Sequence, residues 1–209
     1  MTPRVDDILR LRLGAALLQQ KPAPGWVARG LAGAPWVVVR RGEIRNDVIP
    51  VRVRGGTSGL RFDSLVSLSA IADRSTPEEL AGRTCDPYRT AQVPALLALA
   101  RVHPVLTRRG HSWGPIGSIG FELATNLPAA TPASDLDLVL RLEEPLGAAQ
   151  ARRLLRDLVE AAAPVRIDVL VEMPLGAVNL GDLALRPDRV LMKTTSGIRV
   201  IADPLREAA

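Results

Sequence analysis

Residues 117–137 read GSIGFELATNLPAATPASDLD, and this stretch holds the most chemically informative residues of the chain. The pair Gly117-Ser118 opens it, at a point where we expect a strand to end. Asp135 and Asp137 close it and lead into an apolar run. Glycine lets a backbone approach a phosphate group closely, and a serine hydroxyl and neighbouring amides donate hydrogen bonds to phosphate oxygens. The stretch therefore indicates a protein that handles phosphate.

The two aspartates share one face of a predicted strand. In the sequence SDLDLVL, alternation places Asp135 and Asp137 together and turns Leu136, Leu138 and Leu140 toward the core. Two carboxylates about 5 Å apart repel each other by roughly 3 kcal/mol at an effective dielectric of ~20. Protonation of one acid would offset this repulsion, and so would Mg²⁺ bound through oxygen ligands.

A third acid, Asp168, lies in another apolar segment whose alternate residues take the buried face. It is placed to join the same cluster. Three carboxylates around one or two Mg²⁺ ions can neutralise a polyphosphate and activate an attacking hydroxyl. We therefore predict that Asp135, Asp137 and Asp168 are catalytic residues and metal ligands in a phosphoryl or nucleotidyl transfer.

Basic residues complete the predicted site. The net charge of +5 is divided unevenly, with +8 in residues 1–110 and −3 in residues 111–209, which indicates an anionic partner: polyphosphate, nucleic acid or an acidic protein. A predicted strand places Arg52 and Arg54 on one face, either as a solvated surface or as a contact for phosphate or a carrier protein. For Lys193, a solvated strand end is the alternative. The predicted phosphate-binding residues are Gly117, Ser118, Ser134, Lys193, Arg52 and Arg54.

Composition narrows the class of protein. The single cysteine, Cys85, cannot close an intrachain disulfide, which favours a cytoplasmic protein. The N-terminus lacks the long apolar run of a signal peptide, and no apolar run reaches the roughly 18 residues that span a bilayer. We expect a soluble protein with an aliphatic core.

The predicted fold is α+β, with a small, basic, β-rich N-terminal domain over residues 1–92 that binds carrier or substrate. Asp6 and Asp7 are interpreted as the cap of a helix whose apolar residues run from 8 to 18. Residues 60–72 have no clear pattern. The other expected features are strands at 36–41 and 49–54, a break at Gly55-Gly56, a helix start at 75–80 and a linker at 82–93.

Residues 93–209 are expected to form an α/β domain with a mixed sheet. Glu122 either lines the pocket or is simply a polar residue of a short helix, and Trp113 is interpreted as a core anchor. The expected elements are helices at 94–108 and 147–163, the second with Leu154, Leu155, Leu158 and Val159 inward, and strands at 136–142, 165–171, 189–193 and 198–201.

The order of these motifs resembles the nucleotidyltransferase superfamily of the polymerase-β kind, in which a Gly-Ser strand end precedes a two-acid strand and a later third acid. More narrowly, WGPIGSIGFELAT at 113–125 and SDLD at 134–137 resemble the signature of the malonate decarboxylase holo-acyl-carrier-protein synthases, the phosphoribosyl-dephospho-CoA transferases. Supporting segments are VVVRR at 37–41, IPVRVRG at 49–55, RIDV at 166–169 and VIADP at 200–204.

The resemblance implies a defined reaction and a nucleotidyltransferase-like catalytic domain at 93–209. The 2′-(5″-phosphoribosyl)-3′-dephospho-CoA group would pass from its triphosphate precursor to a serine of the apo acyl-carrier subunit of malonate decarboxylase, with release of pyrophosphate. Mg²⁺ on Asp135 and Asp137 would stabilise the developing charge, while Asp168 would hold a second metal or accept the proton. It implies no nucleic-acid or membrane partner.

Two alternatives belong to other functional classes. One is a nucleotidyltransferase that uses ATP with the same three acids. The other is a non-catalytic assembly protein that binds an acidic carrier through the face around Arg52 and Arg54. Clustered carboxylates argue against the second alternative, because a docking module has no need of them.

Overall fold

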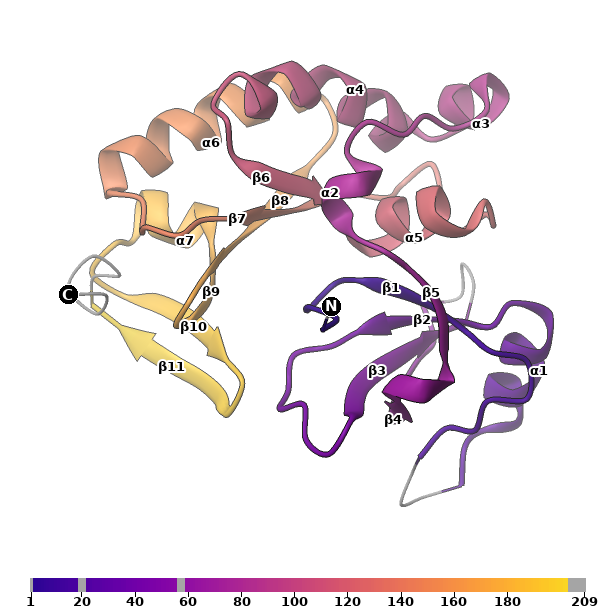
Figure 1. The fold of residues 1–209 in the computed structure, drawn as a ribbon. Coiled ribbons are helices and arrows are strands. Elements are labelled where there is room, and N and C mark those ends of the chain that lie inside the picture. Colours follow the sequence, from indigo (N-terminus) through magenta and orange to yellow (C-terminus); the bar gives the residue numbers. More distant parts are fainter. Residues whose placement is uncertain (1, 19–21, 56–58, 203–209) are drawn as a thin grey trace.

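The computed structural model of the chain describes residues 2–18, 22–55 and 59–202. Gly56 of the predicted break and the Asp203-Pro204 end of the last quoted motif lie outside these ranges. The described residues form two β-sheets with helices around them, as Figure 1 shows, which confirms the predicted α+β class. Within the described ranges, no helix is long and apolar enough to cross a bilayer.

The first sheet has five antiparallel strands in the order β4-β3-β2-β1-β5. Its aliphatic core also includes Val27 of α1 (Gly25–Gly33). Val51 and Val53 of β3 are buried, and Arg52 and Arg54 take the opposite face as predicted. The strands are β1 (Ile8–Leu11), β2 (Trp36–Val39), β3 (Val48–Arg54), β4 (Arg61–Ser67) and β5 (Ile71–Ser75).

The N-terminal segment corrects one expectation, because the predicted helix over residues 8–18 is wrong. Ile8, Leu9 and Leu11 are buried in β1, which pairs with β2 on one side and β5 on the other. Asp6 has a left-handed φ of 70° and caps no helix. Apolar residues at this spacing suit one face of a helix and equally a short strand between two others. The long-range pairing decided between them.

The segment without a clear pattern, residues 60–72, supplies one edge strand of this sheet and the beginning of the other. It contains β4, a single 3-10 turn, η2 (Leu68–Ala70), and the start of β5. The Oγ of Ser67 accepts a hydrogen bond from the amide of Ser69 at 3.3 Å and so caps the turn. The turn interrupts the alternation of the two strands, which explains why no single period is visible.

The second sheet has six strands in the order β11-β10-β9-β8-β7-β6. Among the described strands of this sheet, only β7 and β8 pair in parallel, because α6 (Ala148–Ala162) crosses between them; the other pairs are antiparallel. The mixed sheet predicted for this part of the chain is thereby confirmed. The strands are β6 (Ser112–Pro115), β7 (Leu136–Arg141), β8 (Ile167–Met173), β9 (Gly176–Asn179), β10 (Val190–Thr194) and β11 (Gly197–Ile201).

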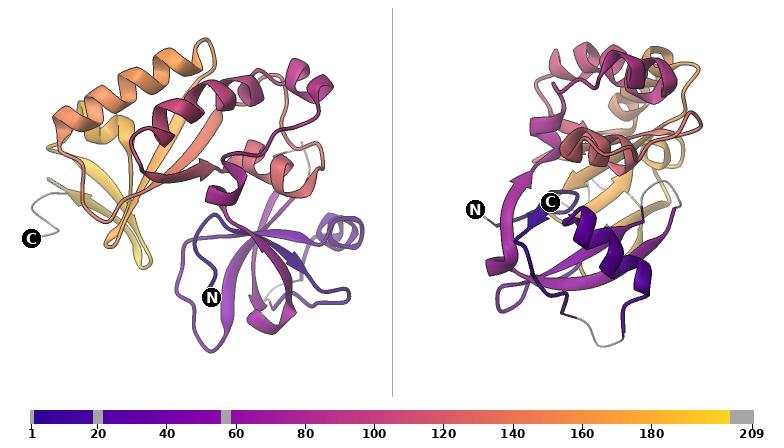
Figure 2. Two further views of the ribbon diagram at one scale, coloured as in Figure 1. Left: turned by 45° about the horizontal axis from the view of Figure 1, so that its top comes forward. Right: turned by 90° about the vertical axis from the view of Figure 1, so that its right-hand side faces the viewer.

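Helices cover one face of the second sheet, and the first sheet lies beyond its other face (Figures 1 and 2). The covering helices are α4 (Pro94–Thr107) and α6, joined to the sheet by a largely aliphatic core that includes Trp113, the predicted anchor. On α6, Leu154 and Leu158 are buried as expected, but Val159 is 50% exposed and does not point inward. Shorter helices are α5 (Gly117–Thr125) and α7 (Leu180–Leu185).

Two short helices, α2 (Pro77–Leu80) and α3 (Pro87–Gln92), follow the end of β5. Thr76 and Glu79 form a reciprocal capping box on α2, which confirms the predicted helix start. Asp86 caps α3, and this helix occupies part of the segment interpreted as a linker. The domain division at residue 92 stays a prediction.

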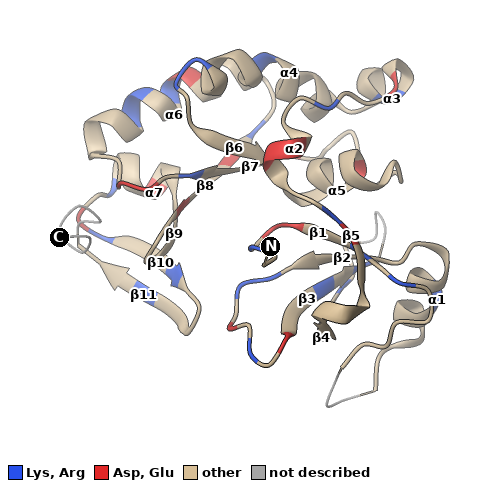
Figure 3. Ribbon diagram, viewed as in Figure 1, with Lys and Arg blue, Asp and Glu red and all other residues tan. Residues whose placement is uncertain are grey.

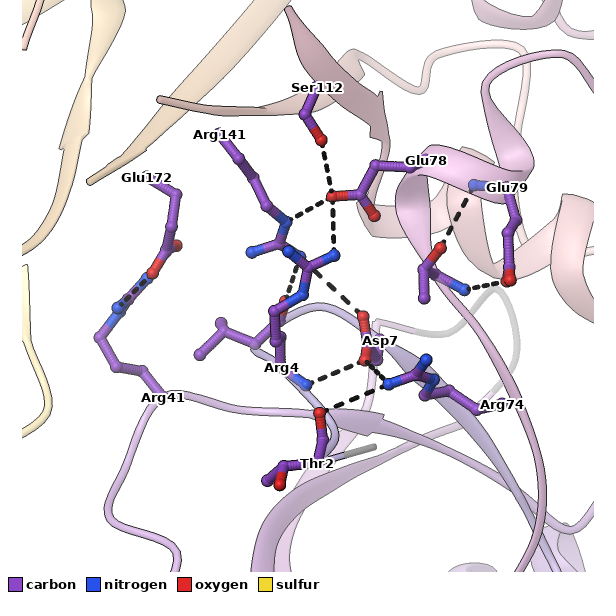
Figure 4. Close-up of polar contacts among 12 residues, drawn as sticks. Thr2, Arg4, Asp7, Arg41, Arg74, Glu78, Glu79, Ser112, Arg141 and Glu172 are labelled. Atoms are coloured by element: carbon purple, nitrogen blue, oxygen red, sulfur yellow. Dashed lines mark hydrogen bonds and ion pairs between the residues drawn. The ribbon is translucent and has the colours of Figure 1, made fainter. Parts of the chain in front are cut away.

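A network of polar contacts joins the first sheet to the second, as Figure 4 shows. Arg141 of β7 donates from Nε to the Glu78 Oε1 of α2 at 2.7 Å and from Nη2 to the Val5 carbonyl at 2.9 Å. Arg4 also donates to Glu78, at 3.0 Å. The N-terminal segment, α2 and β7 are therefore held in one arrangement.

Two further contacts strengthen this joint. Arg41, just after β2, makes a bidentate pair with Glu172 of β8, at 2.9 and 2.5 Å. Asp7 is fully buried, accepts from the Arg4 amide at 2.9 Å and lies 3.9 Å from Arg141 of β7. Burial nevertheless raises the pKa of Asp7 above its ordinary value, because these contacts only partly offset the lost hydration.

Gly114 of β6 provides a test of how tightly α2 packs on the second sheet. A Cβ at this position would lie 1.8 Å from the Pro77 carbonyl oxygen of α2. We expect Gly114→Ala to lower the free energy of unfolding by about 3 kcal/mol, because backbone rather than a flexible side chain must move. Chemical denaturation measures the change.

The matched control is Gly30→Ala, in α1, where nothing lies within 4 Å of an added Cβ. It should be neutral or stabilising by about 0.5–1 kcal/mol, because alanine favours helix more than glycine does. Equal stability of Gly114→Ala and the wild type would contradict the close packing of α2 on β6.

Candidate active site

The acidic centre of the candidate site is a pair of aspartates on adjacent strands. Asp137 of β7 and Asp168 of β8 are direct partners in the parallel register. Asp135 lies just before β7, while Leu136, Leu138 and Leu140 are buried on the other side, as alternation predicted. The tertiary structure thus brings the three predicted acids to one end of two neighbouring strands.

The electrostatics of Asp137 distinguish it from an ordinary strand-end acid. Its pKa is raised to about 6, first by burial and then by the nearby carboxylates of Asp168 and Asp135, while Arg54 and Arg61 oppose the shift. Negative charge at this position is therefore only partly compensated by the protein. A bound cation would compensate it.

The other two acids have partners of their own. Asp135 lies 3.6 Å from the Arg166 guanidinium, and Asp168 accepts a short hydrogen bond from the Asn179 side chain. Across residues 2–18, 22–55 and 59–202, no three His, Cys, Asp or Glu side chains are placed closely enough to hold a metal ion. Carboxylate oxygens are the donors that Mg²⁺ prefers, so the residue types suit this ion, and its binding here stays a prediction.

Gly117 lies directly against the acidic pair. β6 ends at Pro115 and α5 begins at Gly117, so the Gly-Ser pair does follow a strand end. Gly117 has a left-handed φ of 65°, and a Cβ on it would lie 2.2 Å from Asp137 Oδ2. The position needs glycine for both reasons.

The two predicted serines, Ser118 and Ser134, do not line the open space beside Asp137. Ser134 Oγ accepts from the Thr131 amide at 2.9 Å and closes a turn before β7. Ser118 is partly buried in the first turn of α5. Their role in binding phosphate stays a prediction.

Arginines of the first sheet lie opposite these acids across an open space, and one lysine of the acids' own sheet also lines it. Arg52, Arg54 and Arg61 come from β3 and β4 of the first sheet, and Lys193 comes from β10 of the second. Figure 3 shows basic residues on β3 and β10 and acidic ones on β7 and β8. We refer to the space lined by Arg52, Arg54, Arg61, Asp137, Asp168 and Lys193 as the cleft.

Three residues of the cleft escaped the sequence analysis. Asp6 was interpreted as a helix cap, and Arg61 lies in the stretch that had no clear pattern. Asn179 lines the cleft too, and besides holding Asp168 it caps α7 by accepting from the Gly181 amide at 2.7 Å. An asparagine directly before a short helix is a visible capping signal, but its contact with β8 depends on strand pairing.

Glu122 does not line the cleft. It is buried, forms a bidentate pair with Arg89 at 2.8 and 3.0 Å, and accepts from the Ala129 and Ala130 amides at 2.9 Å. These hydrogen bonds lower its pKa despite burial, which acts in the other direction. Glu122 therefore anchors the loop between α5 and β7.

Comparison with known proteins agrees with this geometry. Residues 79–204 match the family model described as "Phosphoribosyl-dephospho-CoA transferase MdcG C-terminal domain". The chain belongs to this family of transferases. The matched residues include the acidic pair, Gly117, Asn179 and Lys193, whereas the arginines of β3 and β4 precede them.

Relatives within the family align along nearly the whole chain. A phosphoribosyl-dephospho-CoA transferase of Pseudomonas putida (strain GB-1) is 43% identical over 202 residues, covering 97% of this chain and 95% of the relative. Those of Azotobacter vinelandii and Pseudomonas aeruginosa are 41% and 35% identical, covering 90% and 99% of this chain and 88% and 95% of the relatives. No solved structure matches the chain.

Replacement of Gly117 tests whether Asp137 needs its present position. We expect Gly117→Ala to lower the transferase activity at least tenfold, because the added methyl group overlaps the Asp137 carboxylate. The matched control is Gly110→Ala, which has a similar φ of 69° but nothing within 4 Å. It should cost about 1–2 kcal/mol of stability and leave activity unchanged. Equal activity losses in the two variants would refute the steric argument.

Asp6 lines the cleft and carries an uncompensated charge. Its Oδ2 is buried and has no hydrogen-bond partner among the described residues. The pKa of Asp6 is raised to about 6, first by burial and then by the Glu172 carboxylate, while Arg141 and Arg41 oppose the shift. The folded state therefore binds a proton more tightly than the unfolded state does, and ionisation of Asp6 destabilises the fold as the pH rises from about 4 to 6.

We accordingly expect Asp6→Asn to stabilise the protein by about 2 kcal/mol at pH 8 and to have little effect at pH 4, where the wild-type carboxyl is protonated. Asparagine tolerates the left-handed backbone. Urea unfolding at the two pH values measures the difference. Asp47→Asn, at an exposed residue with a φ of 59°, is the control for backbone effects. A gain that did not depend on pH would contradict the argument.

Proposed function

We propose that this chain transfers the 2′-(5″-phosphoribosyl)-3′-dephospho-CoA group from 2′-(5″-triphosphoribosyl)-3′-dephospho-CoA to a serine of the apo acyl-carrier subunit of malonate decarboxylase, with release of pyrophosphate. Family membership supports the proposal. The observation that carries it is the pair of carboxylates on β7 and β8, which shares one cleft with three arginines of the first sheet. Transfer from a triphosphate requires compensation of phosphate charge on both sides of the reacting phosphorus.

Mg²⁺ is the cofactor that we propose. Asp135, Asp137 and Asp168 would hold it. Asp137 and Asp168 are direct partners in the parallel register, and the pKa of Asp137 is raised first by burial and then by the other two carboxylates, a repulsion that a cation would offset. When bound, Mg²⁺ supplies neutralisation of the phosphate oxygens.

The side chains around the acids would bind and orient the donor. Gly117 keeps the backbone clear beside Asp137, and Asn179 fixes the Asp168 carboxylate. Lys193 and Arg54, which line the cleft, would hold phosphate oxygens. Arg52 also lines the cleft but is already engaged by Asp63 in the same sheet. The donor would therefore lie with its triphosphate between the two sheets.

In the proposed reaction the carrier serine Oγ attacks the α-phosphorus. The Oγ–P bond forms, the bond from this phosphorus to the bridging oxygen breaks, and the electron pair leaves with pyrophosphate. The serine proton passes to Asp168 or to water. We propose residues 1–92 as the part that binds carrier or substrate, and the cytoplasm as the compartment, where the carrier is made.

Mass spectrometry of the carrier tests the proposed function. With Mg²⁺, the triphosphoribosyl donor and apo carrier, we expect the carrier to gain the mass of the prosthetic group. Asp135→Asn and Asp137→Asn should each slow this transfer about 100-fold or more, because the site would hold less tightly the Mg²⁺ that neutralises the phosphate oxygens. Asp188→Asn, at an exposed residue outside the cleft, is the matched control and should transfer at the wild-type rate.

Other outcomes would point elsewhere. A carrier that gains AMP from ATP, and nothing from the triphosphoribosyl donor, would show a nucleotidyltransferase of different specificity. A carrier that binds without any gain in mass would show a non-catalytic assembly protein. Unchanged rates in both aspartate variants would contradict the acidic site.

A further inference from the structure

Two successive cross-strand pairs on the cleft face of the first sheet differ in charge. Arg52 of β3 is opposite Asp63 of β4, and the two form a bidentate pair at 2.6 and 3.0 Å; Arg40 also reaches Asp63, at 3.2 Å. The next pair on the same face is Arg54 opposite Arg61. Like charges directly opposite each other destabilise a sheet. The Arg54–Arg61 pair therefore lowers the stability of the fold, whereas the Arg52–Asp63 pair does not.

Within residues 2–18, 22–55 and 59–202, neither guanidinium of the Arg54–Arg61 pair has a hydrogen bond or ion pair. The Arg54 side chain is partly buried and lies over the Phe121 ring of α5, with Cζ 5.7 Å from the ring centroid. Burial lowers the pKa of Arg54, and repulsion by Arg61 lowers it further. Two positive charges therefore lie on neighbouring strands, and no anion among the described residues forms an ion pair with either of them.

The pair faces the acidic pair of the second sheet. Arg54 and Arg61 both line the cleft with Asp137, and both lower the pKa of Asp137. Arg54 nevertheless makes no ion pair with Asp137 within 4 Å. Phe121 belongs to the helix that begins at Gly117, so Arg54 is held across the interface by the helix that also flanks Asp137.

From this geometry we infer that the Arg54–Arg61 pair is the subsite for the two terminal phosphates of the donor and for the pyrophosphate that leaves. The inference rests on the proposed function for the identity of the donor. The α-phosphate must lie at the carboxylates where transfer occurs, so the β- and γ-phosphates extend toward the basic wall. Guanidinium groups suit them because they bind phosphate oxygens through two parallel hydrogen bonds.

Such a subsite explains why the repulsive pair is tolerated. An anion with three or four negative charges bound between the two arginines would remove the repulsion. It also explains why Arg52 is neutralised and Arg54 is not, although both face the cleft. Bound pyrophosphate should therefore stabilise the protein more than it stabilises a variant without the pair.

Titration with inorganic pyrophosphate tests the inference without carrier or donor. In isothermal titration calorimetry of the full chain with Mg²⁺, we expect Arg54→Gln and Arg61→Gln each to raise the Kd for pyrophosphate at least tenfold, because each loses a charge-assisted contact. Arg10→Gln, on β1, removes the same charge from an exposed residue outside the cleft and is the matched control. Its Kd should stay within about twofold of the wild-type value at 150 mM salt, where distant surface charges are screened.

Thermal unfolding separates a binding role from a structural one. Without pyrophosphate, Arg61→Gln should be as stable as the wild type or more stable, because the repulsion is gone. With pyrophosphate, the rise in Tm that the wild type shows should be much smaller in the variant. A variant that is less stable without the ligand would indicate a structural role and overturn the inference.

Three further results would overturn it: no binding of pyrophosphate to the wild type at millimolar concentration, an unchanged Kd in both pair variants, or an equal loss in Arg10→Gln. These failures differ from failure of the proposed function. If the carrier is loaded and the pair variants bind pyrophosphate normally, the subsite is wrong and the reaction stands. If the carrier is not loaded but pyrophosphate binds through the pair, the subsite stands and the proposed reaction is wrong.

Discussion

The buried contacts of Arg141 fix the acidic strands of the second sheet relative to the arginine-bearing strands of the first. This side chain, only 10% exposed, lies on β7 four residues after Asp137 and reaches both Glu78 of α2 and the Val5 carbonyl. Val5 precedes β1, which is joined through β2 to the strand that carries Arg52 and Arg54. Loss of one partner would leave a buried charge without compensation, which typically costs 3–5 kcal/mol. The position of the acidic strand relative to the basic strands thus depends on this guanidinium, together with the Arg41–Glu172 pair.

Charged residues that face the first sheet from β7 and β8 are of two kinds, those with a partner arginine and those without. On β8, Glu172 lies four residues beyond Asp168 on the same face, and Arg41 neutralises it in a bidentate contact. Asp168 and Asp137, nearer the open end, face arginines that they do not pair with. Neutralised pairs close the interface between the sheets. Charges kept apart leave a cleft whose acidic and basic walls can each receive part of a ligand.

The long segment between Ser118 and Asp135 is held by one buried carboxylate. The Glu122 carboxylate on α5 is shared by the Arg89 guanidinium and two backbone amides of this segment. A buried acid with four donors satisfies most of its lone pairs, so the segment keeps a defined path although it forms no strand. The Gly117-Ser118 pair and the Asp135–Asp137 stretch are therefore joined by a segment of defined path.

The sequence by itself determined the features that follow from local pattern. Alternation placed Asp135 and Asp137 opposite a leucine face, identified β3 with its arginine face, and assigned α4 and α6 from apolar spacing, while the Gly-Ser and Asp-Leu-Asp motifs pointed to the family. It failed at β1, where a short apolar pattern fits helix and strand alike. It failed again at residues 60–72, where a turn interrupts the period. Only the tertiary structure decided that Asp168 is in register with Asp137, that Arg61 is opposite Arg54, and that Asp6 and Asn179 reach the cleft. Each of these depends on which strands pair and how two sheets are joined, and such contacts between residues distant in sequence leave no period in the chain.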